Sequence, residues 1–191
     1  MKKAAALGLL AISLAASSVD PAAAAANMYI KFEEPAVTGD STSQEHAGEI
    51  EIMSWSHGFS QPTSPVRSTV GGGGVEQANH SNFTFTKYLD SATDDLLKQC
   101  WTGKQFKKAT VKCYRADGAA DNKPVQYLMI EMEHVVISNL SISGGAGDLP
   151  VENVSLDYGI VKYTYKPQKR ADGTAGDQQA IQHDLEQRKI E

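Results

Sequence analysis

The sequence predicts a mainly β protein, built as an antiparallel β barrel or a two-sheet sandwich with one flanking α-helix. Several segments alternate apolar and polar residues with a period of two, which is the pattern of a strand with one buried face. Residues 91–103 combine apolar residues at helical spacing with helix start and stop signals. Turn residues, above all glycine and proline, separate the strands, as they do in antiparallel folds.

Length and composition fit a single globular domain and exclude several classes of protein. The chain has 191 residues, of which 41% are hydrophobic and 21% are charged, a balance that excludes collagen-like, prion-like and broadly disordered chains. Its 18 basic and 23 acidic residues give a net charge of -5. An acidic chain does not bind nucleic acid mainly through counterion release, so we expect no nucleic-acid partner.

Residues 1–26 have the composition of a secretory signal peptide. Lys2 and Lys3 precede an uncharged run over residues 4–19, and alanines at 22–26 supply Ala-x-Ala cleavage sites. An amphipathic or disordered N-terminal extension is the alternative. The apolar core is too short to cross a bilayer, and no later stretch reaches the roughly 18 apolar residues of a spanning helix. We therefore predict no membrane span, and a periplasmic protein if the signal is used.

The remaining chain divides into a β domain at residues 27–167 and a polar C-terminal tail at residues 168–191. Residues 28–32 alternate and predict the first strand. The second predicted strand covers residues 49–59. Its apolar residues change parity at Met53, which predicts a bulge there or burial on both faces.

A long connection of low complexity follows at residues 61–81, and it contains Gly71, Gly72, Gly73 and Gly74. Glycine-rich loops bind phosphate when Lys-Ser or Lys-Thr follows and the loop opens an apolar helix. Neither feature is present, so we expect a connector. Loops of this length often become ordered against a partner.

The third strand and the helix come next. Residues 82–88 predict a strand with Phe83 and Phe85 on one face. Ser91 and Asp94 approximate a capping box, which predicts the start of a helix. Apolar residues at helical spacing and a glycine stop signal complete the pattern: Leu96, Leu97, Cys100, Trp101 and Gly103.

The two cysteines lie on neighbouring elements. Cys100 ends the predicted helix, and Cys113 lies within the fourth predicted strand at residues 105–115. A disulfide between them would close a loop worth about 3 kcal/mol in the chain-entropy model. Two buried thiols that pack as small apolar residues are the alternative. With two cysteines in the chain, a zinc site built from four cysteines is excluded.

The clearest alternation places apolar residues on even positions from Leu128 to Ile142. A strand this long must twist and bend, and it can contribute to two sheets. A similar pattern over residues 151–166 changes parity beside Gly159, where a bulge would redirect the strand. In the polar tail, Ile181 and Leu185 predict only a weak helical turn.

Residue types that carry catalysis or bind metals do not form a known motif. The Gly-x-Ser-x-Gly elbow is absent, and His134 on the apolar even face predicts a hydrogen-bonded core histidine. Glu131 and Glu133 share the opposite face, which favours solvated carboxylates over an acid–base pair. We expect no enzyme, metal or cofactor; a hydrolase using His57 or Glu131 is the enzymatic alternative. No zinc-hydrolase pair occurs among His46, His57, His80, His134 and His183.

Three segments carry a recognisable family pattern. They are HAGEIEIMSWSHG at residues 46–58, FTFTKYLD at residues 83–90 and ENVSL at residues 152–156. In order and spacing they resemble the haemolysin-coregulated protein (Hcp) family, which forms the inner tube of the bacterial type VI secretion system. The similarity extends from about Met28 to Gly176.

The resemblance implies a β barrel with a flanking helix that assembles into a hexameric ring. Stacked rings form a secreted tube that works with sheath and spike components and carries small effector proteins in its lumen. We expect Pro35 to Glu45 and Gln61 to Ser81 to contact neighbouring subunits and rings. His46, Trp55 and His57 are the motif residues expected to organise that region, with core and strand-end packing as the alternative. The resemblance implies no catalytic residue and no cofactor.

The two ends of the chain depart from the family pattern. Tube subunits are expected to assemble in the cytoplasm without a signal such as residues 1–26. Either this copy is exported as a stand-alone Hcp-like binding module, or the segment stays uncleaved or precedes a working start at Met28. Near the other end, residues 181–185 lack the Gly-aromatic pair expected there.

Overall fold

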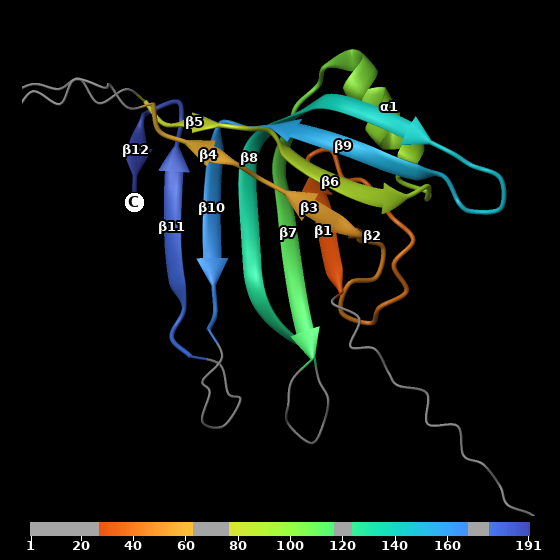
Figure 1. Cartoon of the computed structure of the whole chain (residues 1–191), viewed down its shortest axis with the longest axis horizontal. Helices are drawn as coiled ribbons and strands as arrows, with labels where there is room; N and C mark the ends of the chain where they lie inside the picture. The colour runs from red at the N-terminus through yellow and green to blue at the C-terminus, as the bar shows by residue number, and fades with distance from the viewer. Residues whose placement is uncertain (1–26, 63–76, 117–123, 168–175) are drawn as a thin grey trace, which may run out of the picture.

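The computed structural model describes residues 27–62, 77–116, 124–167 and 176–191 (Figure 1). This part of the chain contains one helix and twelve strands. In order they are β1 Met28–Glu33, β2 Ile50–Glu51, β3 Ser54–Ser56, β4 Phe59–Ser60, β5 Asn79–His80, β6 Phe83–Tyr88, α1 Thr93–Thr102, β7 Phe106–Ala116, β8 Pro124–Ser143, β9 Val151–Asp157, β10 Ile160–Tyr165, β11 Gln179–Asp184 and β12 Lys189–Ile190.

Ten of these strands form one branched antiparallel sheet. Its main sheet has the order β12-β11-β10-β8-β7-β1-β2, and its side sheet pairs β8 with β9, β9 with β6 and β6 with β3. Figure 1 shows β9 and β6 running across the strands of the main sheet. The predicted mainly β, antiparallel fold with one helix is confirmed.

The sheet is not closed into a barrel, which was one of the two predicted architectures. Among the described strands, β12 pairs with β11 and β2 pairs with β1, and no pairing joins these two outer strands. The chain changes layer within β8, between β2 and β3, and between β9 and β10. Phe32 of the main sheet faces Phe85 of the side sheet, with ring centroids 6.5 Å apart, so the apolar core lies between the layers.

The long strand β8 contributes to both sheets, as predicted. Residues up to Glu133 pair with β10, and residues from Val136 onward pair with β9. The prediction that even positions face the core throughout is wrong, because His134 has a positive φ of 56° and the buried positions change from Met132 to Val135. The predicted core histidine is also wrong: the His134 side chain is 45% exposed and lies 2.9 Å from Glu186.

The strand predicted over residues 151–166 is divided at Gly159, where a change of direction was expected. β9 belongs to the side sheet, whereas β10 pairs with β8 and β11 in the main sheet. A Cβ atom at Gly159 would lie 2.6 Å from Oε1 of Glu186. The absent Cβ leaves room beside this corner for the contact between Glu186 and His134.

The strand predicted over residues 49–59 is divided into β2, β3 and β4, and the break at Met53 confirms the predicted irregularity. The Ile52 amide donates to the Met28 carbonyl of the main sheet at 2.9 Å, and the Met53 amide donates to the Thr86 carbonyl of the side sheet at 2.8 Å. Two consecutive residues thus belong to different layers. The chain therefore changes sheet here, as it also does in β8 and at Gly159.

The helix α1 lies where it was predicted, but its cap differs from the prediction. The capping box of Ser91 and Asp94 is wrong, because the N-cap residue is Ala92 and makes no side-chain cap bond. Asp90 takes over: its carboxylate accepts from the Ala92 amide at 3.0 Å. Gly103 ends the helix with a φ of 62°, as expected of a left-handed stop.

The C-terminal residues form strands, so the helical turn predicted at Ile181 and Leu185 is wrong. β11 pairs along the whole of β10, with Ile181 opposite Tyr163, and β12 pairs with β11. The open edge of β10 offers backbone partners that a single isolated helical turn lacks. No helix in the described part of the chain is long and apolar enough to span a membrane.

Candidate functional site

Each of the three family-like segments contributes a strand to the side sheet. Trp55 of β3 is paired with Phe85 of β6, and Phe85 is paired with Val154 of β9. The Trp55 indole also stacks on Phe83, with ring centroids 5.6 Å apart. Segments separated by up to about a hundred residues of sequence therefore form three adjacent strands, which explains why the pattern extends over the whole domain.

A buried ion pair joins two of these segments. Lys87 on β6 is directly opposite Glu152 on β9. Their charged atoms lie 2.6 Å apart and both side chains are 0% exposed. The Lys87 ammonium also contacts Asp90 at 2.6 Å and donates to the Thr93 hydroxyl at 3.3 Å. This network connects the side sheet to the start of α1, and its complete burial leaves it inaccessible to a substrate.

His46 belongs to a second buried group at the edge of the main sheet. Its ring stacks on Tyr29 with centroids 4.2 Å apart, and its Nδ1 lies 3.0 Å from Glu49. Glu49 in turn pairs with Lys112 of β7 at 2.8 Å. Within the single chain, these contacts anchor the loop that connects β1 to β2. A role of His46 at a contact between subunits stays a prediction.

His57 belongs to a chain of hydrogen bonds that extends from Tyr163 on β10 to His183 on β11. Its Nδ1 lies 2.5 Å from the Tyr163 hydroxyl, and its Nε2 lies 2.6 Å from the Tyr158 hydroxyl. Tyr158 also contacts Nδ1 of His80 at 2.8 Å, and Nε2 of His80 lies 2.9 Å from Nδ1 of His183. We call this series, in the order Tyr163, His57, Tyr158, His80 and His183, the His–Tyr chain.

The surroundings of the His–Tyr chain favour its neutral form. Burial lowers the pKa of His57 to about 4, and the nearby His80 adds to that decrease. Burial, together with His183, also lowers the pKa of His80. Burial raises the pKa of Tyr158 and of Tyr163. At neutral pH, His57 and His80 are therefore uncharged imidazoles, and the two phenols keep their protons.

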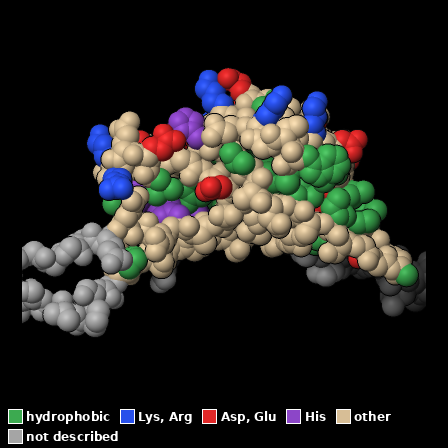
Figure 2. Space-filling model, turned by 90° about the horizontal axis from the view of Figure 1, so that it is seen from above, with side chains coloured by type: hydrophobic (Ala, Val, Ile, Leu, Met, Phe, Trp, Pro, Cys, Tyr) green, Lys and Arg blue, Asp and Glu red, His purple; other side chains and the backbone are tan. Residues whose placement is uncertain are grey.

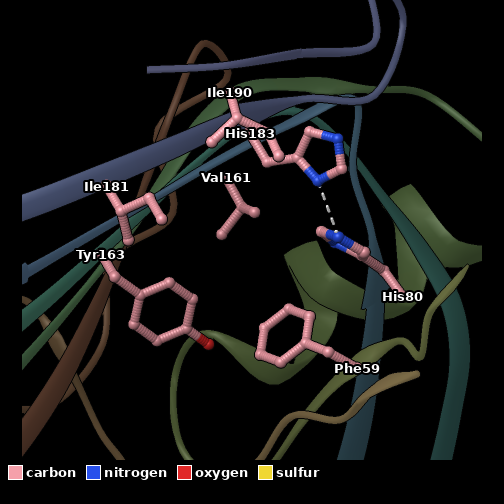
Figure 3. Close-up of a pocket in the computed structure, with 7 residues that line it drawn as sticks. All are labelled: Phe59, His80, Val161, Tyr163, Ile181, His183 and Ile190. Atoms are coloured by element: carbon pink, nitrogen blue, oxygen red, sulfur yellow. Dashed lines mark hydrogen bonds between the residues drawn. The ribbon is translucent and has the colours of Figure 1, made fainter. Parts of the chain in front are cut away.

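A pocket of about 330 Å³ adjoins the His–Tyr chain. Figure 3 shows the imidazoles of His80 and His183 on one side of the cavity and the rings of Tyr163 and Phe59 along another. Apolar side chains from β10, β11 and β12 complete the wall: Val161, Ile181 and Ile190. Among the described residues that line the pocket, those with polar side chains are His80, His183 and Tyr163.

The residues considered for hydrolysis already have partners. Both ring nitrogens of His57 contact tyrosine hydroxyls, and Glu131 accepts from Lys108 at 2.5 Å. No group of three or more His, Cys, Asp or Glu side chains able to hold a metal ion occurs in the described residues. These contacts leave neither His57 nor Glu131 as a free general base.

The remaining predicted residues divide into two groups. Cys100 and Cys113 are both free, so the disulfide considered between them is not formed. Burial raises the pKa of the Cys113 thiol, as expected of a buried thiol that packs as a small apolar residue. The glycines Gly71, Gly72, Gly73 and Gly74 lie outside the described residues.

Sequence reasoning missed the Lys87–Glu152 pair and the His–Tyr chain, although the alternation pattern contains a signal for the pair. Lys87 has the same parity as Phe83 and Phe85, and Glu152 has the same parity as Val154 and Leu156. A charged residue on the buried face of each of two strands indicates a buried pair. The His80–His183 contact joins residues 103 positions apart, and no local pattern predicts it.

Comparison with known proteins identifies similar chains. The family described as "Type VI secretion system effector, Hcp" matches residues 29–165. "Protein hcp1" of Pseudomonas aeruginosa is 38% identical over 150 residues, which cover 78% of this chain and 88% of that protein.

Solved structures show the same fold. One described as a type six secretion system protein has a TM-score of 0.75 at 26% identity, and the match covers 87% of this chain and 100% of that chain. Hcp1 from Salmonella typhimurium has a TM-score of 0.68 at 24% identity, with 86% and 98% of the two chains covered.

Proposed function

The chain belongs to the Hcp family of type VI secretion proteins, and from that premise we propose that it is a ring-forming tube subunit. The observation that carries this proposal is the family match over residues 29–165, which includes the strands of both sheets from β1 to β10. We further propose that six copies close into a ring, that rings stack, and that the function is structural and not enzymatic.

The surface of the single chain supports self-association. Large hydrophobic side chains are exposed on the side sheet, on α1 and in the β8–β9 hairpin, and a soluble monomer rarely gathers many of them. Figure 2 shows the larger hydrophobic group at the right of the view, over the end of the molecule that carries α1. The large hydrophobic residues exposed on these elements are Met53, Tyr88, Leu89, Trp101, Ile142 and Leu149.

Two segments are suited to reach neighbouring copies. The connection between β1 and β2 includes residues 35–45, and its anchor at His46 holds it against the sheet edge. Most of the other expected contact segment, residues 61–81, lies outside the described residues, and the β4–β5 ribbon that flanks it is a separate two-stranded sheet. A closed ring needs one surface patch that binds a different patch on the next copy, repeated by rotation. We propose these two segments as parts of such contacts.

The partners of the assembled tube follow from the same proposal. A hollow tube would carry small effector proteins in its lumen, and it would work with the sheath and spike components of the secretion apparatus. The family match supports this reading. Release of the tube would place the protein outside the cell.

Light scattering coupled to size-exclusion chromatography tests the proposal. We expect a species of six times the chain mass at micromolar concentration, and closed rings in electron micrographs. The variant Leu149→Asp places a charge at an exposed hydrophobic position. We expect it to weaken assembly without unfolding the protein. A protein that stays monomeric at high micromolar concentration contradicts the tube proposal.

A second function is favoured by the N-terminal segment. Residues 1–26 have the charge, apolar core and alanine sites of a secretory signal, which a subunit assembled in the cytoplasm would not need. The alternative is an exported, stand-alone Hcp-like binding module in the periplasm. N-terminal sequencing of the protein recovered from cells distinguishes the two, because an N-terminus at Asn27, left by cleavage after Ala26, supports export, whereas an intact Met1 or a start at Met28 contradicts it.

A further inference from the structure

The β4–β5 ribbon, defined here as residues 57–60 and 79–81, is joined to the main sheet by side chains. Its two strands pair with each other, with Phe59 opposite His80, and with no other described strand. The Ser81 hydroxyl donates to the Gly58 carbonyl and accepts from its amide. A two-stranded ribbon alone is marginally stable, so its position depends on what fastens it.

The His–Tyr chain supplies that attachment. Each side of the ribbon contributes one histidine, His57 or His80, and the main sheet with its corner contributes Tyr158, Tyr163 and His183. All four hydrogen bonds of the chain link the ribbon to the main sheet, over distances of 2.5, 2.6, 2.8 and 2.9 Å. Phe59 adds an apolar contact, because its ring centroid lies 6.0 Å from that of Tyr163.

Counting protons shows how this attachment depends on charge. A neutral imidazole has one N–H donor and one acceptor nitrogen, and a phenol can donate and accept at once. With every member neutral, each of the four contacts can therefore hold one proton. If His57 and His80 both become cations, each presents an N–H to the Tyr158 hydroxyl, over 2.6 and 2.8 Å. The phenol proton then loses its acceptor, and two positive charges lie close together.

We propose that the His–Tyr chain is an acid-sensitive latch, which holds the β4–β5 ribbon on the main sheet at neutral pH and releases it when its histidines take up protons. The latch rests on the proposed function, since the ribbon is one of the segments assigned to contacts between copies. Release would therefore change how one ring meets the next. His183 lies beyond the matched residues 29–165, so the family match does not account for the latch.

The direction of the pH effect follows from where the histidines are buried. In the latched state the pKa of His57 is about 4, and in a released, hydrated ribbon it returns to about 6.5. The released state thus binds protons more strongly. The latch is at full strength above about pH 6.5 and weakens as the pH falls toward 4. For His57 alone, these values favour release about tenfold more at pH 5.5 than at neutral pH.

The other charged groups near the His–Tyr chain do not reverse the weakening of the latch at low pH. Asp157 precedes Tyr158 and helps to raise the pKa of that phenol. Asp184 follows His183 and is paired in register with Lys189 on β12. Glu186 is paired with His134 beside the corner at Gly159. Carboxylates favour a cationic histidine, but burial is the largest influence on the pKa of His57 and of His80.

Hydrogen exchange of the full chain at pH 7.5 and pH 5.5, corrected for intrinsic exchange rates, tests the latch. We expect the protection of residues 57–60 and 79–81 to fall about tenfold at pH 5.5, while β9 stays protected at both pH values. His80→Gln can still donate and accept but cannot titrate, so we expect a smaller pH response. His134→Gln is the matched control outside the chain, and it should respond like the unmodified protein.

Several results would overturn the latch. Ribbon protection that is equal at both pH values excludes it, and so does a loss of the pH response in His134→Gln equal to that in His80→Gln. If His80→Gln loses protection in β9 as well, histidine titration followed by NMR in the unmodified protein decides, and an ordinary pKa for His57 contradicts the proposal. A monomeric chain with a pH-dependent ribbon contradicts only the tube, whereas an intact ring with a pH-independent ribbon contradicts only the latch.

Discussion

The Lys87–Glu152 pair and the His–Tyr chain are both polar networks in apolar surroundings, and they differ in access to water. Lys87 and Glu152 are 0% exposed and lie opposite each other on adjacent strands. The histidines of the His–Tyr chain are partly exposed, and they link a separate ribbon to the main sheet. A sealed network of opposite charges can only hold elements together, whereas a partly accessible network of neutral imidazoles can also respond to protons.

Removing one charge of the sealed network is expected to have the largest effect. Lys87→Met leaves the Glu152 carboxylate buried without its partner, and breaking a buried ion pair in this way costs about 3–5 kcal/mol. Urea unfolding followed by circular dichroism measures the loss. The double variant Lys87→Met with Glu152→Leu removes both charges, so we expect it to recover much of the stability. A double variant as unstable as the single one contradicts this explanation.

Cutting the His–Tyr chain at its centre should have an intermediate effect. The Tyr158 hydroxyl contacts both His57 and His80, so Tyr158→Phe leaves two partly buried nitrogens without that partner. We expect a loss of about 1–3 kcal/mol in the free energy of unfolding. Tyr163→Phe removes one contact, to His57, and is expected to lose less. Equal losses of unfolding free energy in the two variants would show that Tyr158 is not the central link of the His–Tyr chain.

The sequence predicts the strands of these two regions better than it predicts the networks. The alternation at Phe83 and Phe85 correctly identifies the buried face of β6, because burial of one face follows directly from a period of two. The change of parity in β8 is missed, because it depends on the positive φ at His134, a conformation that histidine adopts uncommonly. The His–Tyr chain forms only after the ribbon, the corner at Gly159 and β11 have been brought together.

The titration of His57 gives a further contrast between the two networks. Its burial, with His80 nearby, lowers its pKa to about 4, so the folded state prefers the neutral ring. Stability from this group is present above the ordinary pKa of about 6.5 and is lost as the pH falls toward 4. Two-dimensional NMR of the histidine rings measures the pKa. A value near 6.5 in the folded protein would show that the ring is hydrated.

A lysine–glutamate pair on the surface provides the smallest expected effect and isolates the role of burial. Lys107 lies 2.9 Å from Glu34, and these side chains are 67% and 70% exposed. The distance is close to the 2.6 Å of the Lys87–Glu152 pair, so the chemistry and the spacing are similar while the access to water differs. Water screens exposed charges and hydrates a carboxylate that has lost its partner.

We therefore expect Lys107→Met to leave the urea midpoint of unfolding unchanged, whereas Lys87→Met lowers it in the same experiment. If the two variants are equally unstable, burial is not what gives the sealed network its strength, and the contrast with the His–Tyr chain loses its physical basis. If only Lys87→Met is unstable, the difference between the two measurements reports the effect of removing the pair from water. The same lysine-to-methionine exchange is made in both, so the change in side-chain chemistry cancels.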